Sequence, residues 1–167
     1  MRLFATLAAS IVIAAAAVAA DSRHVITAYG VRLSVPAGWH RLEPTQSGVV
    51  DPRMLLVVVT HGATRNPASA CQIAAYHVPA TGAVVVVVGW RTATSDGGDG
   101  RPTGRAPLRM LVRVRRPSFE CFDGRGAAAT LTIGGKAYQV NVMVGDRASR
   151  KLVADALAVV RSFDVVR

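Results

Sequence analysis

Two long apolar runs constrain the fold more than any other feature of this chain. Residues 54–60 have the sequence MLLVVVT and residues 83–90 have the sequence AVVVVVGW. A strand with one face in solvent alternates apolar and polar side chains, so these unbroken runs predict strands that are buried on both faces. Strands of this kind occur in sheets that are covered by helices on each side.

The segment between the two runs is open to two interpretations. Asn66 followed by Pro67 makes a good N-cap and first helical turn, and the following ASACQIAAY is rich in residues that a helix accepts. A strand over CQIAAYHV that returns through a turn at residues 79–82 is almost as plausible. We favour a helix over residues 67–78, because it would form a strand-helix-strand crossover and cover the two buried strands.

Other segments predict more strands and a C-terminal helix. Residues 21–27 are interpreted as a lead-in, and Asp146 is expected to cap a helix over residues 147–161 with one apolar stripe. The predicted strands are residues 30–36, 108–115, 118–122, 127–133, 137–144 and 163–166. The sequence therefore predicts a single α+β domain over residues 21–167. Its central, mostly antiparallel sheet would carry the C-terminal helix and a second helix as an α/β/α sandwich.

Residues 1–20 are expected to be a signal peptide. Arg2 supplies a positive start, an apolar stretch follows, and Ala17-Val18-Ala19 offers the small residues that a signal peptidase recognises, so we expect cleavage before Ala20 or Asp21. The stretch is short for a membrane span. We therefore expect a secreted or envelope-associated protein, with a retained N-terminal anchor as the alternative.

The two cysteines, Cys71 and Cys121, both follow the expected cleavage site. An even number of cysteines in an exported domain predicts one disulfide. In the chain-entropy model, closing a loop of this length stabilises the fold by roughly 4 kcal/mol. Two buried thiols and a catalytic nucleophile are the alternatives.

Basic residues outnumber acidic ones by two to one. The chain has 20 Lys and Arg against 10 Asp and Glu, for a formal net charge of +10. This excess favours an anionic envelope component as partner, although another protein stays open and the charge could serve solubility alone. Nucleic acid is disfavoured by the expected export and by an aromatic content of only 5%.

A row of arginines is the best candidate binding surface in the sequence. Arg109, Arg113 and Arg115 share one face of the predicted strand 108–115, and Arg116 lies beside them. Alternate residues on a strand are about 6.6 Å apart, a spacing that suits successive anionic groups. These four are the candidate anion-binding residues. The alternative is a solvated face whose charges discourage edge pairing.

No catalytic, metal-binding or cofactor motif is present in the sequence. The histidines His24, His40, His61 and His77 have no HExxH or HxH spacing, and G-x-S-x-G does not occur. We therefore expect no catalytic residue, no metal and no cofactor. An exported hydrolase would need residues such as His40, Asp51 and His61 to converge in one pocket.

The two ends of the chain resemble Mog1/PsbP-like domains. GVRLSVPAGWHRL at residues 30–42 leads a strand into Pro-x-Gly-Trp, and ASRKLVADALAVVRSFDVV at residues 148–166 predicts a helix followed by a short strand. The resemblance implies an α/β/α sandwich with a non-catalytic binding or accessory role, and no functional residue carries over. The helix that usually follows the Gly-Trp turn is missing here. The middle of the chain also resembles uncharacterised secreted proteins of GC-rich bacteria.

These observations predict a secreted or envelope-associated, non-catalytic domain of unknown ligand, acting as a binding or accessory protein. The exported hydrolase is one alternative. An adhesin that binds anionic surfaces through the arginine row is the other.

Overall fold

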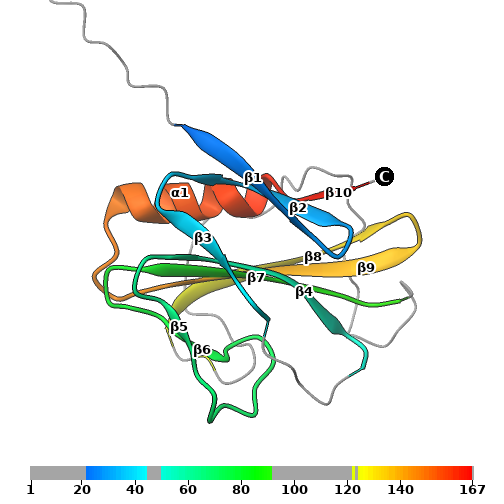
Figure 1. The fold of residues 1–167 in the computed structure, drawn as a ribbon, viewed down its shortest axis with the longest axis horizontal. Coiled ribbons are helices and arrows are strands. Elements are labelled where there is room, and N and C mark those ends of the chain that lie inside the picture. Colours follow the sequence, from blue (N-terminus) through cyan, green and yellow to red (C-terminus); the bar gives the residue numbers. More distant parts are fainter. Residues whose placement is uncertain (1–21, 45–49, 92–121, 123, 167) are drawn as a thin grey trace, which may run out of the picture.

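The computed structural model describes residues 22–44, 50–91, 122 and 124–166, which form three antiparallel sheets and one helix (Figure 1). The large sheet has the order β3-β4-β7-β9-β8, with β3 Trp39–Leu42, β4 Arg53–Thr60, β7 Ala83–Gly89, β9 Lys136–Val144 and β8 Arg125–Ile133. The small sheet has the order β1-β2-β10, with β1 Arg23–Ala28, β2 Val31–Pro36 and β10 Asp164–Val165. The remaining elements are β5 Thr64–Arg65, β6 Tyr76–His77 and the helix α1 Arg150–Arg161.

The two apolar runs form β4 and β7, and the prediction that both are buried on two faces is confirmed. Every residue of Val84–Val88 and of Leu56–Val59 has an exposed fraction of 0%. Val85 and Val87 pack into the core on one face of the sheet, whereas Val84 and Val86 pack into the core on the other. Because the side chains of a strand alternate, both faces need a covering layer.

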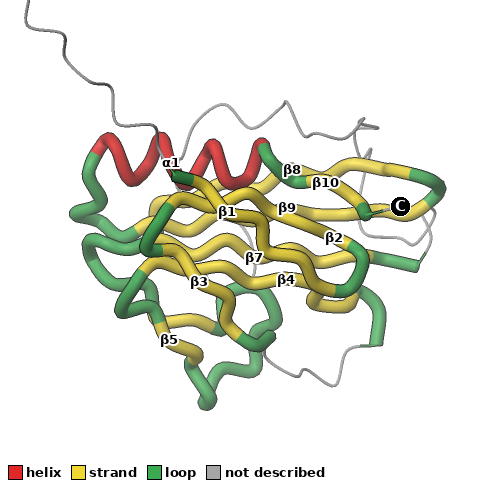
Figure 2. The backbone as a smooth tube through the Cα atoms, turned by 45° about the horizontal axis from the view of Figure 1, so that its top comes forward, coloured by secondary structure: helices red, strands yellow, loops and turns green. Residues whose placement is uncertain are grey.

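One face of the large sheet is covered by α1 together with the small sheet (Figure 2). The helix begins after Ser149, whose Oγ accepts a hydrogen bond from the backbone N–H of Leu152 at 3.1 Å. Its buried stripe includes Leu157 and Val160, and the chain continues through Phe163, which is fully buried. These side chains share a core with Leu33 from the small sheet.

The other face is covered by the segment between β4 and β7, and the favoured helix over residues 67–78 is wrong. Tyr76 and Ala75 are buried against Val57 and Val59, while β6 pairs with β5 in a two-stranded sheet. The long strand that was the other interpretation is reduced to the two residues of β6.

Local hydrogen bonds explain why no helix forms in this segment. The side chain of Asn66 accepts from the N–H of Ala68 at 3.2 Å, and the Asn66 carbonyl accepts from Ser69 at 3.1 Å. The Asn66 N–H itself bonds the carbonyl of Ala75 at 2.8 Å, which closes the segment into a loop. In addition, β4 and β7 are antiparallel neighbours, so no helical crossover is required between them.

The predicted fold class is therefore wrong. The described part of the chain is mostly β and contains a single helix, so it is not an α/β/α sandwich or an α+β domain with a second helix. The helical layer expected on the second face is replaced by a loop and the short β5-β6 pair. The lead-in at residues 21–27 is also corrected, because β1 occupies most of it.

Several shorter predictions are confirmed. Strands occupy residues 30–36, 127–133 and 137–144 almost as predicted, and positive φ angles of 56° and 74° at Gly134 and Gly135 give the tight turn between β8 and β9.

The helix cap is Ser149 and not Asp146, because the N–H of Arg147 bonds the carbonyl of Ala80 and holds this stretch outside the helix. The predicted strand 108–115 and most of 118–122 lie outside the described residues.

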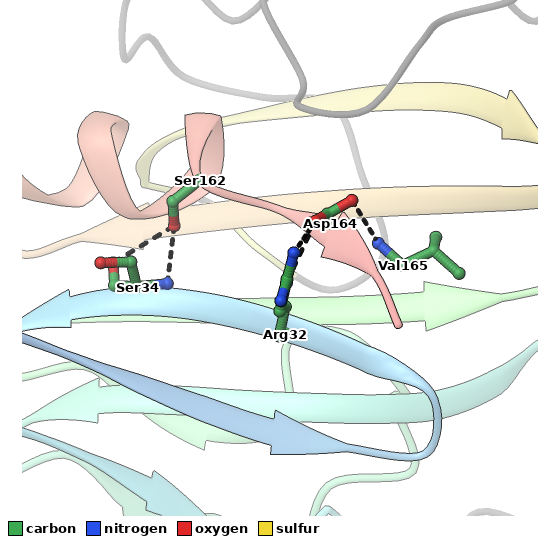
Figure 3. Close-up of polar contacts among 5 residues, drawn as sticks. All are labelled: Arg32, Ser34, Ser162, Asp164 and Val165. Carbon is green, nitrogen blue, oxygen red and sulfur yellow. Dashed lines mark hydrogen bonds and ion pairs between the residues drawn. The ribbon is translucent and has the colours of Figure 1, made fainter. Parts of the chain in front are cut away.

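The end of α1 and β10 are fastened to β2 by side chains (Figure 3). The Oγ of Ser162 accepts a hydrogen bond from the Ser34 N–H at 2.8 Å. The guanidinium of Arg32 pairs with the carboxylate of Asp164, which also accepts from the N–H of Val165 at 2.9 Å. These contacts hold the small sheet together across opposite ends of the chain.

Candidate functional site

A cavity of about 340 Å³ lies at one end of the large sheet, where β4 begins, β7 ends and β9 begins. Strand register explains how its residues meet. Arg53 on β4 is paired with Gly89 on β7, and Gly89 is paired with Tyr138 on β9, so the three form one row across the sheet. Lys136 lies two residues before Tyr138 and therefore shares its face of the sheet. The ladder extends one step further, because the N–H of Trp90 bonds the carbonyl of Ala137 at 2.9 Å.

Among the described residues, three cations and no carboxylate line this cavity. Arg53, Arg91 and Lys136 are all exposed, and within the described ranges none of them forms an ion pair. The carboxylate of Asp51 accepts a hydrogen bond from the backbone N–H of Arg91 at 3.2 Å and does not line the cavity. Unpaired cations around a concave surface create a positive potential that attracts anions.

Tyr29 contributes to the cavity from the tip of the β1–β2 hairpin. Tyr29 and Gly30 both have positive φ angles, 47° and 76°, as a two-residue turn of type I′ requires. A tyrosine in this conformation is unusual and costs about 1–2 kcal/mol. Its side chain is 63% exposed, so the ring presents an aromatic surface at the cavity. The N–H of Val166 bonds the Gly30 carbonyl at 2.9 Å and fixes this tip.

Tyr138 is a largely buried residue of the cavity lining. Its side chain is only 6% exposed, and its ring packs against Phe163 with 5.5 Å between the ring centroids. Across the residues that the structure describes, its hydroxyl has no hydrogen-bond partner. Burial raises the pKa of the Tyr138 hydroxyl above its usual range, so the group stays protonated and can donate a hydrogen bond.

Gly89 lines the cavity and makes room for the side chain of Leu55. A Cβ atom added at Gly89 would lie 2.6 Å from Cδ1 of Leu55 and 3.4 Å from Cδ1 of Tyr138. The register of β4 against β7 shifts between Met54 and Leu56, which makes Leu55 the extra residue of a bulge. The absent side chain at Gly89 therefore leaves the room that Leu55 occupies above it.

The residues of the hydrolase hypothesis do not converge. Asp51 precedes β4 and His61 follows it, so the eight residues of β4, about 26 Å at 3.3 Å per residue, separate them. His40 pairs with Val59 and thus lies towards the His61 end of the strand. All three are exposed, and none lines the cavity. No group of three metal-ligating side chains occurs in the described segments.

The other predicted site residues fall mostly outside the described ranges. These are Arg109, Arg113, Arg115, Arg116 and Cys121. Cys71 lies in the loop between β4 and β7 and carries no free thiol. Its disulfide with Cys121 and the arginine row stay predictions.

Sequence reasoning missed the cavity entirely. Its residues come from four separate segments and form no motif. One signal was available: aromatic or basic residues stand beside the ends of the apolar strands, as Arg53 does before one run and Trp90 and Arg91 do at the end of the other. Only the strand order β4-β7-β9 brings these ends together.

Comparison with known proteins leaves the chain without an assigned family. No protein-family model matches the sequence, and a search of the curated proteins finds no significant match. The described segments contain no helix that is long and apolar enough to cross a membrane.

Proposed function

We propose that this protein is a non-catalytic binding domain whose ligand is a small anionic molecule held in the cavity between β4, β7, β9 and the β1–β2 turn. The observation that carries the proposal is the lining of that cavity. Within the part of the chain that the structure describes, the lining has three cations without ion-pair partners, three aromatic side chains and no carboxylate.

The residues that line the cavity favour a ligand with an anionic group attached to an apolar moiety. Arginine presents a planar fork of N–H donors that matches carboxylate and phosphate groups, which supports Arg53 and Arg91 as contacts for the charge. Tyr29, Trp90 and Tyr138 provide aromatic surface for the remainder of the ligand. A volume of about 340 Å³ is near the lower end for small-molecule sites, so the ligand is small.

Binding is favoured over catalysis by the chemistry of the lining. Histidine, cysteine, serine and carboxylate side chains act as nucleophiles or general bases in hydrolases, and none occurs among the described residues that line the cavity. Tyr138 is held in its protonated form, which makes it a hydrogen-bond donor and not a base.

The expected export and disulfide belong to the same proposal and rest on the sequence. Residues 1–20 have the pattern of a signal peptide, and Cys71 and Cys121 are the pair that an oxidising compartment would join. Mass spectrometry of the protein secreted by an expressing cell tests both features. A mature chain that begins at Ala20 or Asp21 and is two hydrogen atoms lighter than the reduced form is the expected result.

Isothermal titration calorimetry with a panel of small carboxylates and phosphates tests the proposed function. We expect at least one anion to bind, with an affinity that falls as salt is added. Replacing Arg53, Arg91 and Lys136 together with glutamine should weaken that binding at least tenfold. Arg65→Gln is the matched control, because Arg65 is exposed on β5 and does not line the cavity. Equal binding by the triple variant and the wild type would contradict the proposal.

A further inference from the structure

Exposed apolar side chains gather at the end of the molecule that holds the cavity. The described residues include four large hydrophobic residues that are well exposed, Val25, Tyr29, Val50 and Val166, with exposed fractions of 61%, 63%, 66% and 42%. A single exposed apolar residue is normal on a soluble protein. Three of these four, however, are connected to the cavity, and the exception is Val25 in β1.

Hydrogen bonds and chain order connect these three residues to the cavity lining. Tyr29 is itself part of the lining, and the N–H of Val166 donates to the carbonyl of the residue after Tyr29 at 2.9 Å. Val50 precedes Asp51, whose carboxylate accepts a hydrogen bond at 3.2 Å from the N–H of Arg91, another residue of the lining. We call Tyr29, Val50 and Val166 the apolar rim. The β1–β2 turn, the end of β10 and the start of β4, which carry the rim, lie at the same right-hand end of the molecule in Figures 1 and 2.

An apolar rim beside unpaired cations is a combination that binds anionic membrane surfaces. Arg53, Arg91 and Lys136 attract the phosphates of anionic lipids, and each cation near such a surface strengthens binding about fivefold. Aromatic side chains are favoured in the interfacial layer of a bilayer, where Tyr and Trp are enriched. Tyr29 and Trp90 bring such side chains to the same cavity as the three cations.

The size of the cavity suits the head group of a lipid and not the whole lipid. A sphere of 340 Å³ is about 9 Å across, whereas the acyl chains of one leaflet extend about 15 Å, half the thickness of the hydrocarbon core. A bound lipid would therefore leave its acyl chains in the bilayer. The bilayer thus takes up the apolar moiety for which the cavity has little room.

We infer that the cavity is a docking site for an anionic phospholipid in a membrane surface. The lipid phosphate binds the three cations of the lining, and the apolar rim enters the interfacial layer around it. The inference rests on the proposed function and identifies the source of its anion, which is a lipid in a bilayer and not a free molecule in solution.

Sedimentation with vesicles tests the inference on the protein as an expressing cell secretes it. We expect binding to vesicles of phosphatidylglycerol and phosphatidylcholine, none to phosphatidylcholine alone, and weaker binding as salt is added. The rim variant, which combines Tyr29→Asn, Val50→Gln and Val166→Gln, should bind at least tenfold more weakly although every cation is retained.

Two controls show that a loss of binding belongs to the rim. Asparagine is favoured in a type I′ turn, so the rim variant should keep the β1–β2 hairpin and an undiminished thermal unfolding midpoint. Val25→Gln is the matched substitution, because Val25 is nearly as exposed as Val50 but lies outside the rim. It should bind vesicles as the wild type does.

A soluble head group separates the two sources of phosphate. Glycerophosphate carries the anion without acyl chains, so calorimetry should give it an affinity at least tenfold below that for lipid in vesicles. The rim variant should change this affinity less than twofold, because glycerophosphate has no apolar moiety for the rim to contact. Replacing the three cations with glutamine should weaken the binding of both glycerophosphate and vesicles.

The remaining outcomes separate the inference from the proposed function. Vesicle binding equal to that of the wild type in the rim variant or in the glutamine variant of the cations would overturn the inference. So would an absence of vesicle binding while a soluble anion of the panel binds, and the proposed function would then stand. Absence of binding by every anion, free or in vesicles, would overturn both.

Discussion

Ser162 contacts both backbone polar groups of Ser34. The Oγ of Ser162 accepts a hydrogen bond from the Ser34 N–H at 2.8 Å and lies 3.2 Å from the Ser34 carbonyl oxygen, while also donating to the carbonyl of Val159 at 2.7 Å (Figure 3). Ser162 is the C-cap of α1, so one side chain joins the end of the helix to the middle of β2. A short β10 can therefore complete the small sheet without pairing along the whole of β2.

Ser162→Ala should destabilise the fold. The substitution leaves the Ser34 N–H without its acceptor, and an unsatisfied, partly buried donor costs about 1–2 kcal/mol. Urea unfolding followed by circular dichroism measures the change. Ser22→Ala is the control, because the side chain of Ser22 is exposed and only its backbone carbonyl is used. A loss of stability no larger than that of the control would show that the contact contributes nothing.

Ser149→Ala should cost about 1 kcal/mol, the usual effect of removing an N-cap side chain. Asp146→Ala should change the free energy of unfolding by less than about 0.5 kcal/mol, because Asp146 lies three residues before the cap. Thermal unfolding of both variants in parallel distinguishes the two caps. If Asp146→Ala proved the more damaging variant, the helix would begin earlier than the structure places it.

Asn141→Val should leave the protein equally stable or stabilise it by up to about 1 kcal/mol. Asn141 is fully buried, its Oδ1 has no partner in the described structure, and its Nδ2 reaches the Val86 carbonyl only at 3.4 Å. Replacing a poorly satisfied amide with an apolar side chain removes a desolvation cost. The denaturant midpoints of Asn141→Val and the wild type measure this difference in stability.

The matched variant is Asn141→Asp, which has almost the same shape. It buries a carboxylate without a cationic partner and should cost at least about 3 kcal/mol at neutral pH. A large loss in Asn141→Val instead would mean that the amide is satisfied in solution.

Gly89→Ala should weaken ligand binding more than it weakens the fold. The new Cβ displaces Leu55 into the cavity, and because Leu55 is a flexible side chain, we expect a cost in stability near the lower end of the usual 1–3 kcal/mol for overpacking. Adding Leu55→Ala to this variant should restore the room and the binding. Calorimetry with the tightest anion of the panel measures this. Undiminished binding by Gly89→Ala would place the ligand elsewhere.

Tyr138 should make the free energy of unfolding fall at alkaline pH. The unfolded chain releases the phenol proton near pH 10, whereas burial raises the pKa in the folded state, so the folded state binds more protons above that pH. The contribution is intact below pH 10 and declines above it, by at most about 1.4 kcal/mol per pH unit. Urea midpoints from pH 8 to 11 should therefore fall more steeply for the wild type than for Tyr138→Phe. Parallel curves would indicate a phenol with an ordinary pKa.

The buried strands could be predicted from the sequence because each is a run of consecutive apolar residues, which makes both faces of the strand apolar. Each valine of β7 fills one core or the other, whatever the remainder of the chain does. Residues 67–78 could not be predicted in the same way. Their conformation depends on the bond from the Asn66 N–H to Ala75 and on the antiparallel pairing of β4 with β7.

The cavity could not be predicted from the sequence for a related reason. Only strand register makes neighbours of Arg53, Gly89 and Tyr138. Tyr29 reaches the cavity from the β1–β2 turn of the small sheet. No local pattern encodes either relationship. The arginine row, in contrast, depends on one alternating segment and could be proposed from sequence alone.

The partners within the small sheet are far apart in the order of synthesis. Arg32 and Asp164 are separated by 132 residues, so the hairpin of β1 and β2 leaves the ribosome long before β10 exists. At about 5–20 residues per second, the delay is roughly 7–26 s. During that time the nascent hairpin has an open edge and cannot be sealed by its own third strand. The small sheet can thus close only after β10 has been synthesised.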